Sequence, residues 1–360
     1  MNSRKLHDGR QDGLRPLESL SLEKVTSFSD LLRAMSKTAF GGRQLGEAFE
    51  ILVEIAQRPQ CHTVLTVSGA MTVAKQGMII CEMIERGLVD AVVCTGALIA
   101  HGLTESIGLT HYQTDPSQSD KTLYDQGYNR IYDTLEMEAN LNEVEQLIRD
   151  VMGQAPSDGS AWSSASICRA VGQRLDELNH GPGILRSAWR HEVPVFIPAF
   201  TDSEVGLDLS ISAMLFARQS SGASDSPTST EALWETVPPF NPFLDLQQYA
   251  RFALEAEELA IFTIGGGVPR NWAQQVGPYA EIANHRLGTD LPPVRFRYGV
   301  RICPEPAHWG GLSGCSYSEG VSWGKFVPSA EGGRYAEVHA DATVVWPLLM
   351  KAVFEKLDRD

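Results

Sequence analysis

Residues 64–69 read Val-Leu-Thr-Val-Ser-Gly, a short β-branched run that ends at a serine and a glycine. An amphipathic helical pattern follows through about Arg86, and a second such run, residues 91–94, ends at Thr95-Gly96. Buried strands that alternate with helices are typical of a doubly wound, mostly parallel α/β sheet. Ligands of such sheets bind at the carboxyl ends of the strands, which is where these small polar residues stand.

The same alternation continues toward the C-terminus. Residues 193–197, 259–264, 294–298 and 335–339 predict further strands, and a helical pattern follows the last one. Thr201-Asp202 comes after the first of these strands, and a triple glycine, residues 265–267, comes after the second. Any one such turn is ordinary, but four together favour a cofactor site in a Rossmann-like fold. Neither G-x-G-x-x-G after the first strand nor a P-loop motif occurs, so a nucleotide would be held by other glycines.

Three segments fall outside this alternation. Residues 1–20 predict a mobile lead-in, and residues 27–58 predict two N-terminal helices that are broken at Gly41-Gly42. A Ser/Thr/Pro-rich stretch at about 218–240 predicts a surface excursion. We expect a single NAD-binding α/β domain over residues 21–360.

Composition argues against several classes of function. Thirty basic against 45 acidic residues give a net charge of −15, which disfavours nucleic acid as a partner and is compatible with a cationic substrate. No stretch approaches the roughly 18 apolar residues of a membrane span, and the N-terminus lacks the apolar segment of a secretory signal. Six scattered cysteines without a CxxC pair or a His/Cys cluster indicate reduced thiols in the cytoplasm and argue against a structural zinc site.

Residues 319–325 read Glu-Gly-Val-Ser-Trp-Gly-Lys and place a carboxylate, an indole and a primary amine within seven positions. A carboxylate and an aromatic face can hold a cationic amine. A lysine that is shielded from water can lose its proton and act as a nucleophile. The alternative is a surface lysine after a glycine-rich turn, with Trp323 as an ordinary core residue.

This lysine run resembles a motif of the deoxyhypusine synthase family, and five further segments match that family in order. They are residues 38–46, 126–131, 198–202, 264–268 and 341–349, so the similarity covers the chain from about residue 20 to its end. The resemblance implies an NAD-dependent transferase that moves an aminobutyl-type group from a polyamine, usually spermidine, through a lysine imine to an acceptor amine. It also implies a homotetramer built from dimers, with the sites at the dimer interface.

The resemblance implies that Lys325 is the covalent nucleophile, that Trp323 lines the amine channel and that Glu319 binds an ammonium group. Nine positions fall where the family contacts NAD: Ser68, Gly69, Thr72, Thr95, Gly96, Asp202, Gly266, Asp341 and Ala342. A carboxylate at a strand end can bind ribose hydroxyls, but Asp202 and Asp341 are equally explained as helix caps or turn residues. For Ser68 and Thr72, ordinary capping is likewise an open alternative.

The amine pocket departs from the family's protein-modifying members at several positions. Ala100-His101 replaces a Glu-Glu pair, Asn271 replaces a histidine, residues 308–314 replace an acidic loop, and Leu207-Asp208 aligns with a pocket aspartate. Because carboxylates are lost, we expect the donor or the acceptor amine to differ. We predict that Asn271, Asp208 and Trp309 contact the substrate and that His101 shuttles protons. A hydrogen-bonded structural role for His101 and plain packing for Trp309 are the alternatives.

Three functions are compatible with these observations. The first is an aminoalkyl transferase whose acceptor is more consistent with a small amine, as in homospermidine formation, than with the lysine of a protein. The second is an NAD-dependent amine oxidoreductase that releases NADH. The third is a catalytically silent relative that binds NAD or a partner. The joint presence of Lys325, Glu319 and Trp323 favours the transferase.

Overall fold

The computed structural model describes residue 4 and residues 6–152, 161–220 and 235–359 of the chain. Its centre is a six-stranded sheet in the order β6-β2-β1-β7-β8-β9, in which every neighbouring pair is parallel. The strands are β1 (Cys61–Val67), β2 (Ala91–Cys94), β6 (Val195–Phe196), β7 (Glu258–Ile264), β8 (Phe296–Ile302) and β9 (Arg334–Val338). Taken in chain order within this sheet, the arrangement is 3-2-1-4-5-6, the order of the Rossmann fold. The predicted fold class and all six predicted strands are confirmed.

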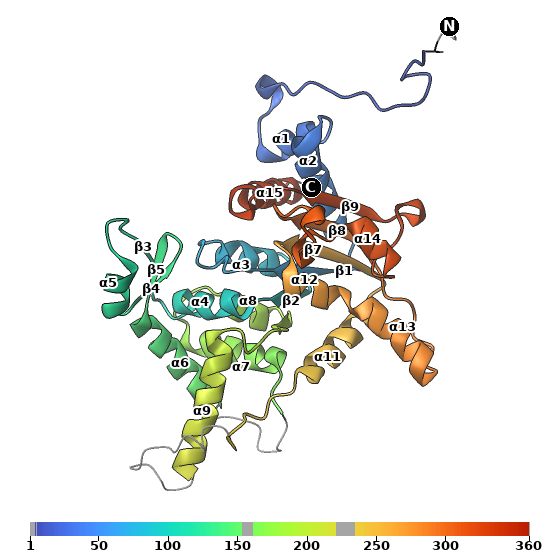
Figure 1. The fold of residues 1–360 in the computed structure, drawn as a ribbon. Coiled ribbons are helices and arrows are strands. Elements are labelled where there is room, and N and C mark those ends of the chain that lie inside the picture. The colour runs from blue at the N-terminus through green and yellow to red at the C-terminus, as the bar shows by residue number, and fades with distance from the viewer. Residues whose placement is uncertain (1–3, 5, 153–160, 221–234, 360) are drawn as a thin grey trace.

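Helices cover both faces of the sheet (Figure 1). The α-helices of the described residues are α1 (Phe28–Met35), α2 (Phe40–Ala56), α3 (Gly77–Glu85), α4 (Gly96–Ser106), α5 (Asp120–Asp125), α6 (Glu138–Met152), α7 (Ser164–Leu178), α8 (Ile184–Arg190), α9 (Glu204–Ser220), α11 (Pro242–Glu255), α12 (Gly267–Gln274), α13 (Val276–Leu287), α14 (Tyr317–Ser322) and α15 (Ala342–Leu357).

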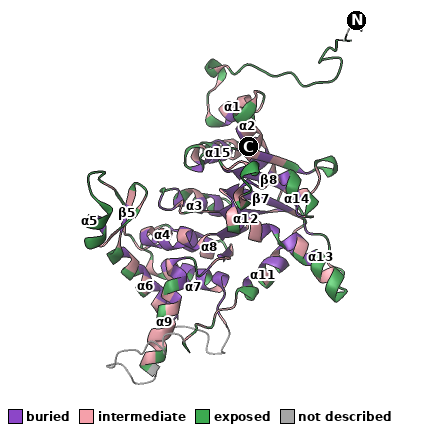
Figure 2. Ribbon diagram, in the orientation of Figure 1, coloured by how far each residue is buried: buried purple, intermediate pink, exposed green. Residues whose placement is uncertain are grey.

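Two hydrophobic cores result from this arrangement, one on each face of the sheet. Leu65 and Val67 of β1 pack into the larger core, whereas Val64 packs into the smaller one. Successive strand residues point to opposite faces, so a strand that is apolar throughout must be covered on both sides. The buried residues accordingly gather on the strands and on the faces of the helices that cover them (Figure 2).

The break between the two N-terminal helices lies earlier than predicted. Residues 36–39 separate α1 from α2, and Gly41-Gly42 lies within the first turn of α2. The helices cross where Gly46 faces α1, because a Cβ at Gly46 would lie 2.3 Å from the Ser36 nitrogen and 2.5 Å from the Leu32 oxygen. The glycine that shapes this helix pair is therefore Gly46.

The helix predicted to follow the first strand is shorter than expected, since α3 begins only at Gly77. The residues before it form turns that side chains fix to other elements. Thr72 Oγ1 donates to the Leu98 oxygen at 2.9 Å, and Gln76 Nε2 donates to the Thr343 oxygen at 2.8 Å. Lys75 adopts a φ of 60°, which a helix does not accommodate. Tertiary contacts have replaced the helix that the pattern favoured.

A second, antiparallel sheet was not predicted. It consists of β3 (Tyr112–Gln113), β4 (Tyr128–Ile131) and β5 (Thr134–Met137) in the order β3-β5-β4. These strands are short and largely polar, so they carry little hydrophobic periodicity. The sheet lies beside α4 and α5 and leads through β5 into α6 (Figure 1).

The remaining expectations concern the ends and the surface of the molecule. Residues 6–20 are exposed and extend away from the sheet (Figure 1), while their predicted mobility stays a prediction. Most of the predicted surface excursion, residues 221–234, lies outside the described residues. All six cysteines carry free thiols. Among the helices of the described segments, none combines the length and the apolar character that crossing a membrane requires.

We predict that Gly46→Ala destabilises the protein by about 2–3 kcal/mol, because the new methyl group must displace backbone atoms of α1. Gly41→Ala, in the same helix but with nothing within 4 Å of the new Cβ, should change stability by less than about 1 kcal/mol. Urea unfolding measures both. Equal effects would show that the close approach at Gly46 does not constrain the helix pair.

Candidate functional site

Four neighbouring strands of the large sheet end around one pocket of about 210 Å³. Its lining comes from residues that follow the strands: Ala199 and Asp202 after β6, Cys94, Thr95 and Gly96 at β2, Ser68 after β1, and Gly267, Val268 and Pro269 after β7. The chain order of the sheet reverses between β1 and β7. The pocket therefore lies where open α/β sheets bind their ligands.

The turns after β1 and β7 are locked together at the base of this pocket. The Ser68 hydroxyl donates to the Gly266 oxygen and accepts from the Gly266 nitrogen, the latter at 3.3 Å. Gly265 has a φ of 82°, and a Cβ on Gly266 would lie 2.6 Å from the Ser313 Cα. Both positions therefore require glycine, which explains the triple glycine without a G-x-G-x-x-G motif.

The pocket offers groups that suit the pyrophosphate and a ribose of a dinucleotide such as NAD. Helices α4 and α12 begin at its wall with Gly96 and Gly267, and helix N-termini attract the negative charge of a pyrophosphate. The exposed carboxylate of Asp202 lies at the rim, where it can accept from ribose hydroxyls. The residues present thus fit the cofactor that the family resemblance implies.

The nine predicted cofactor residues divide into two groups. Ser68, Thr95, Gly96 and Asp202 line the pocket, and Gly69 and Gly266 adjoin lining residues in the chain. Thr72, Asp341 and Ala342 do not line it, and their visible roles are structural. Thr72 bonds the backbone of α4, whereas Asp341 caps α15 by accepting from the Thr343 nitrogen and hydroxyl, both at 2.8 Å. Ala342 is the buried first residue of α15.

Lys325 follows α14, just beyond Gly324 with its φ of 69°. The lysine is only 8% exposed, whereas Trp323 is 62% exposed, so the alternative of a surface lysine beside a core tryptophan is wrong. Lys325 Nζ donates to Asn271 Oδ1 at 3.3 Å and lies 5.8 Å from the centre of the Trp323 ring. Its backbone is fixed as well, because the Lys325 oxygen accepts from the Phe296 nitrogen at 3.0 Å.

The surroundings of Lys325 favour its neutral form. Burial lowers the pKa of this amine, and the positive charge of Arg270 lowers it further, while Cys315 and Glu319 act in the opposite direction. Arg270 is itself buried, donates to the Cys315 oxygen at 2.7 Å and lies 5.3 Å from the Tyr317 ring centre. A neutral lysine is a nucleophile, and a neighbouring cation is one of the ways in which proteins obtain one.

Helix α12 connects the pocket to the lysine. Val268 and Pro269 line the pocket, and Asn271, which holds Lys325, lies two residues further along the same helix. An α-helix rises about 1.5 Å per residue, so Pro269 and Asn271 are separated by about 3 Å along the helix axis. Helix α12 thus supplies both part of the pocket lining and the partner of Lys325, although Pro269 and Asn271 point to different faces of the helix, about 200° apart.

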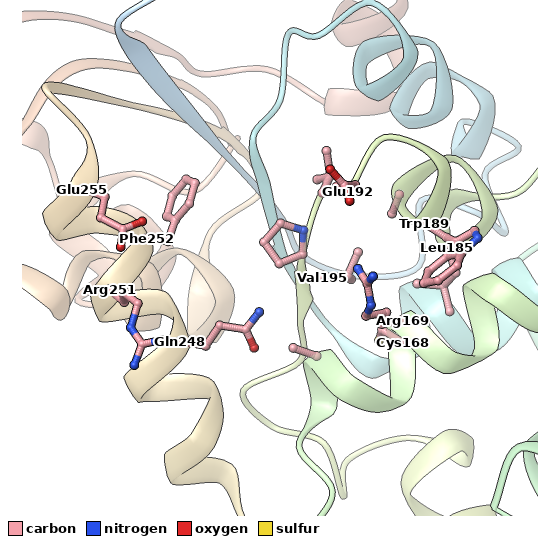
Figure 3. Close-up of a pocket in the computed structure, with 14 residues that line it drawn as sticks. Cys168, Arg169, Leu185, Trp189, Glu192, Val195, Gln248, Arg251, Phe252 and Glu255 are labelled. Atoms are coloured by element: carbon pink, nitrogen blue, oxygen red, sulfur yellow. The ribbon is translucent and has the colours of Figure 1, made fainter. Parts of the chain in front are cut away.

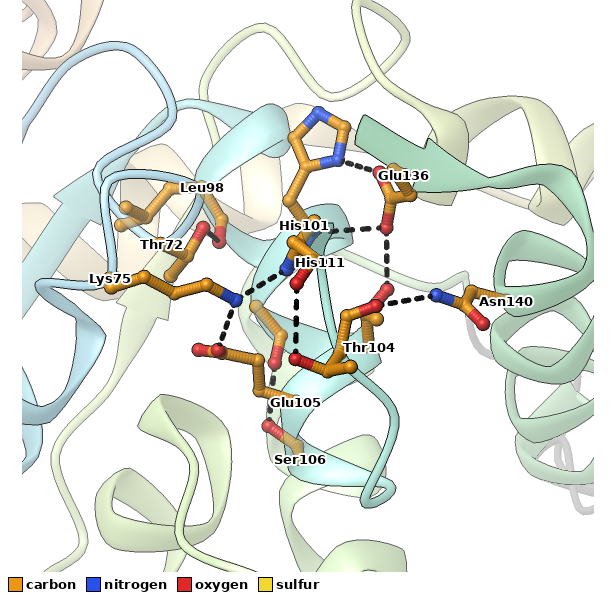
Figure 4. A network of polar contacts seen from close by, with 12 residues as sticks. Thr72, Lys75, Leu98, His101, Thr104, Glu105, Ser106, His111, Glu136 and Asn140 are labelled. Atoms are coloured by element: carbon orange, nitrogen blue, oxygen red, sulfur yellow. Dashed lines mark hydrogen bonds and ion pairs between the residues drawn. The ribbon is translucent and has the colours of Figure 1, made fainter. Parts of the chain in front are cut away.

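His101 lies on α4, five residues beyond Gly96 at the pocket wall. Its Nδ1 contacts the carboxylate of Glu136, which also accepts from Thr104 Oγ1 at 2.6 Å (Figure 4). Burial lowers the pKa of His101, but the hydrogen bond and the charge of Glu136 outweigh burial, so that the net pKa is raised. Sequence reasoning missed Glu136 and His111, since no local motif relates them to His101.

Asp208 lies one turn after Glu204 on α9, also on this side of the pocket. Burial, Glu145 and Glu204 together raise the pKa of Asp208 to about 6. Three carboxyl groups that repel one another form a favourable place for a cation. Glu319 stands apart from them, on α14 near Lys325, where its nitrogen donates to Ser316 Oγ at 3.1 Å.

Trp309 belongs to the 3₁₀ helix Ala307–Trp309 and is 71% exposed. Its ring packs against His308, with 6.2 Å between the ring centres. Among the described residues, no ring or polar contact joins Trp309 to Lys325, so the predicted substrate role of Trp309 stays a prediction.

A further hollow of about 290 Å³ lies at the opposite end of β6 (Figure 3). It opens between α7, α8 and α11 and is lined by Arg169, Glu192, Arg251 and Glu255 together with Trp189 and Phe252. None of the predicted site residues lines it. Its charges alternate in sign, and the strand ends that would bind a dinucleotide face away from it.

We predict that Asp208→Asn stabilises the protein at pH 8 by about 1 kcal/mol, a value reduced for partial solvent screening. The raised pKa means that the folded state carries a disfavoured charge above pH 6. The gain should disappear near pH 4, where the carboxyl group is protonated. Asp125→Asn, in an exposed pair with Lys121, should give no gain. Urea unfolding at both pH values decides, and a loss of stability at pH 8 would contradict the prediction.

We also predict how fast cyanate modifies Lys325 and Lys121, whose side chain is 81% exposed. The rate at pH 8 divided by the rate at pH 10 should be larger for Lys325 than for Lys121. The ratio of the two rates cancels differences in access, and burial of Lys325 favours its neutral amine. Peptide mass spectrometry measures the labelling. An equal ratio at the two lysines would refute an activated amine.

Comparison with known proteins agrees with the resemblance. The sequence model of the family described as "DS: Deoxyhypusine synthase" matches residues 30–353. The "probable deoxyhypusine synthase 2" of Methanosarcina acetivorans is 31% identical over 334 residues, which are 92% of this chain and 88% of the relative. A protein of the same name from Archaeoglobus fulgidus is 30% identical over 315 residues, or 88% and 94% of the two chains.

The fold is shared with solved structures as well. The crystal structure of an Entamoeba histolytica protein, provisionally described as a deoxyhypusine synthase, superimposes with a TM-score of 0.57 and 13% identity over 94% of this chain and 97% of that one. At this identity the match concerns the fold alone. The match of the family model to residues 30–353 and the relatives at 30–31% identity lead to one conclusion: this chain belongs to the deoxyhypusine synthase family, a family of NAD-dependent aminobutyl transferases.

Proposed function

We propose that this protein transfers an aminoalkyl group from a polyamine donor to a small acceptor amine, with Lys325 as the covalent carrier. The observation that carries the proposal is the buried amine of Lys325, which is held by Asn271 of the same helix that contributes Val268 and Pro269 to the pocket at the strand ends. A buried lysine beside a cofactor pocket, with an aromatic ring and a carboxylate nearby, is suited to imine chemistry.

Ser68, Thr95, Gly96, Asp202 and Gly266 would hold the cofactor. NAD, when bound there, supplies an acceptor for a hydride from the carbon beside a secondary amine and later returns that hydride. The residues of the chain provide the remainder of the chemistry. Thr95 caps α4 by accepting from the Leu98 nitrogen at 3.3 Å, which keeps the first turn of that helix in place at the pocket.

In the carrier step, Nζ of Lys325 attacks the carbon of the donor's C=N group. A new C=N bond to Lys325 forms, the C–N bond to the departing amine breaks, and the proton released by Lys325 passes to that amine. The acceptor amine then attacks the same carbon and frees Lys325. We assign the movement of these protons to His101, while Trp323 and Glu319 hold the ammonium group of the substrate.

The charges of the site support a polyamine as the substrate class. Asp208, Glu204 and Glu145 lie on the α9 side, and Glu319 lies on the α14 side. His101 and Asn271 stand where the protein-modifying members carry a carboxylate and a histidine. A pocket with fewer fixed negative charges favours substrates with fewer positive ones, which is why we propose a homospermidine synthase-like reaction rather than modification of a protein lysine.

We further propose that a second copy of the chain completes the site, within a tetramer that is built from two dimers, in the cytoplasm. Three large apolar side chains are open to solvent: Val268 at the pocket is 48% exposed, Leu207 on α9 is 61% exposed, and Trp323 beside Lys325 is 62% exposed. Exposed apolar groups of this size are typical of surfaces that a partner covers. The free thiols suit a reducing compartment. Light scattering of the purified protein measures the size of the assembly.

The central test is chemical trapping. The purified protein is incubated with NAD and one amine at a time (spermidine, putrescine, agmatine or homospermidine), reduced with borohydride and digested for mass spectrometry. We expect an aminoalkyl adduct on Lys325 with the true donor. It should be absent in Lys325→Ala and present in Lys351→Ala, whose lysine is exposed on α15.

The products separate the alternatives. Labelled donor should yield a labelled small polyamine while the amount of NAD stays constant. Efficient labelling of the lysine of the hypusine-containing translation factor would instead establish a true deoxyhypusine synthase. Accumulation of NADH without transfer would indicate an amine oxidoreductase, and NAD binding without any adduct would indicate a silent relative.

A further inference from the structure

A chain of polar side chains leads from the surface to His101 (Figure 4). Glu105 Oε1 accepts from Lys75 Nζ at 2.5 Å, and Lys75 Nζ lies 2.8 Å from His111 Nδ1. His111 Nε2 lies 3.3 Å from Glu136 Oε1, and Glu136 Oε2 bonds His101 Nδ1. The outer members, Lys75 and Glu105, are partly exposed, whereas the side chains of His111 and Glu136 are 0% and 1% exposed.

The donors and acceptors of this chain determine where the protons lie. An ammonium group only donates, so Nδ1 of His111 must accept from Lys75, and the ring proton of His111 therefore lies on Nε2, toward Glu136. The ionised carboxylate of Glu136 only accepts, so His101 carries a proton on Nδ1. Nε2 of His101 has no hydrogen-bond partner among the described residues, and 12% of this side chain is exposed.

A metal ion is the competing explanation, because the ligand atoms of His101, His111 and Glu136 lie within 4.8 Å of one another. A metal would need the lone pair on Nε2 of His111, which would move the ring proton to Nδ1. That nitrogen faces the ammonium of Lys75 at 2.8 Å, and two donors cannot satisfy each other. The contact of Lys75 with Nδ1 of His111 therefore argues against a metal centre, while Nε2 of His111 faces Glu136 at 3.3 Å without completing a hydrogen bond.

We propose that Glu136 is a positioning residue that holds the Nδ1 proton of His101, so that Nε2 is the ring nitrogen presented to the substrate amine. His111, held by Lys75, and Thr104 keep the Glu136 carboxylate in place. The proposal rests on the proposed transferase function for its substrate. In each transfer a proton moves between an amine nitrogen and Nε2 of His101, while Glu136 stays ionised and Nδ1 keeps its proton.

The charged groups that face His101 come from three sides. Glu136 on β5 bonds the ring, Glu204 on α9 adds a second negative charge, and the ring centre of His111, in the segment before β3, lies 6.3 Å away. Burial alone lowers the pKa of His101, and the two carboxylates together raise it above its ordinary value. Removing the charge of Glu136 leaves the effect of burial in place, so the pKa of His101 should fall.

The test compares wild type with Glu136→Gln, which keeps the size of the side chain and removes its charge. Hydrogen–deuterium exchange at the imidazole C2 position, followed by peptide mass spectrometry across pH, reports the midpoint of His101 without requiring activity. We expect this midpoint to fall by at least one pH unit in Glu136→Gln. An unchanged His101 midpoint overturns the proposal, whatever happens to activity.

Activity supplies the second readout. The expected loss is about tenfold to a hundredfold in kcat with little change in KM, because a positioning residue contributes less than the roughly 10²–10⁴-fold of the acid–base group itself. The acidic limb of the pH profile should move to lower pH together with the His101 midpoint. If wild type shows no transferase activity while the midpoint still falls, the transferase assignment is wrong and the positioning of His101 by Glu136 stands.

Two controls guard against indirect effects. Asp245→Asn removes another buried carboxylate, one that accepts from the nitrogens of Ser164 and Ala165 at 3.0 and 2.9 Å. It should lower stability and leave the His101 midpoint unchanged. If Glu136→Gln does not fold, Lys75→Met tests the same chain from its exposed end. The contact from Lys75 then no longer fixes His111 Nδ1 as an acceptor, and Glu136→Asp completes this pair of variants: its shorter carboxylate withdraws from Nδ1 of His101, so the His101 midpoint should fall, and an unchanged midpoint contradicts the proposal.

Stoichiometric Zn²⁺ bound by wild type and lost in Glu136→Gln would also overturn the proposal, because the metal would then occupy the nitrogens that we assign as hydrogen-bond donors. Metal analysis of the purified protein, after dialysis with and without added Zn²⁺, measures this directly.

Discussion

Parallel pairing of β1 with β2 on one side and with β7 on the other is the constraint on which the rest of the molecule depends. From β1 the chain adds β2 and β6 on one side of the sheet and then adds β7, β8 and β9 on the other side. The turns after β1 and β7 therefore diverge and leave room between them. The bonds between Ser68 and Gly266 close the base of that space. The helices that begin at its wall then determine where Lys325 and His101 can lie.

The two flanks of the pocket have opposite electrostatic character. On the α12 side, burial and the fixed charge of Arg270 make Lys325 a weaker base than a lysine in water. On the α4 side, the buried carboxylate of Glu136 makes His101 a stronger base than an ordinary histidine. The transfer that we propose needs both properties, since the carrier in it must be free of its proton while a neighbouring group must be able to hold one.

Sequence reasoning succeeded where the deciding information is local. The six strands of the large sheet are short apolar runs that end in small polar residues, and the lysine motif is contiguous, so both could be predicted.

The failures concern contacts between distant segments. The helix before Gly77 was shortened by bonds from Thr72 and Gln76 to α4 and α15. The link from His101 to Glu136 spans 35 positions, and the polar strand that carries Glu136 has no periodicity to reveal it. Asp341 shows the opposite case. Its motif was identified and predicted to contact the cofactor, but in the structure its carboxylate caps α15.

Helix α12 has a consequence for how the proposed transfer would be timed. Its eight residues begin at the pocket with Gly267 and hold the amine of Lys325 through Asn271. If a cofactor bound at the pocket moved the first turn of so short a helix, Asn271 would move with it. In the transfer that we propose, loading of Lys325 would then depend on whether the pocket is occupied.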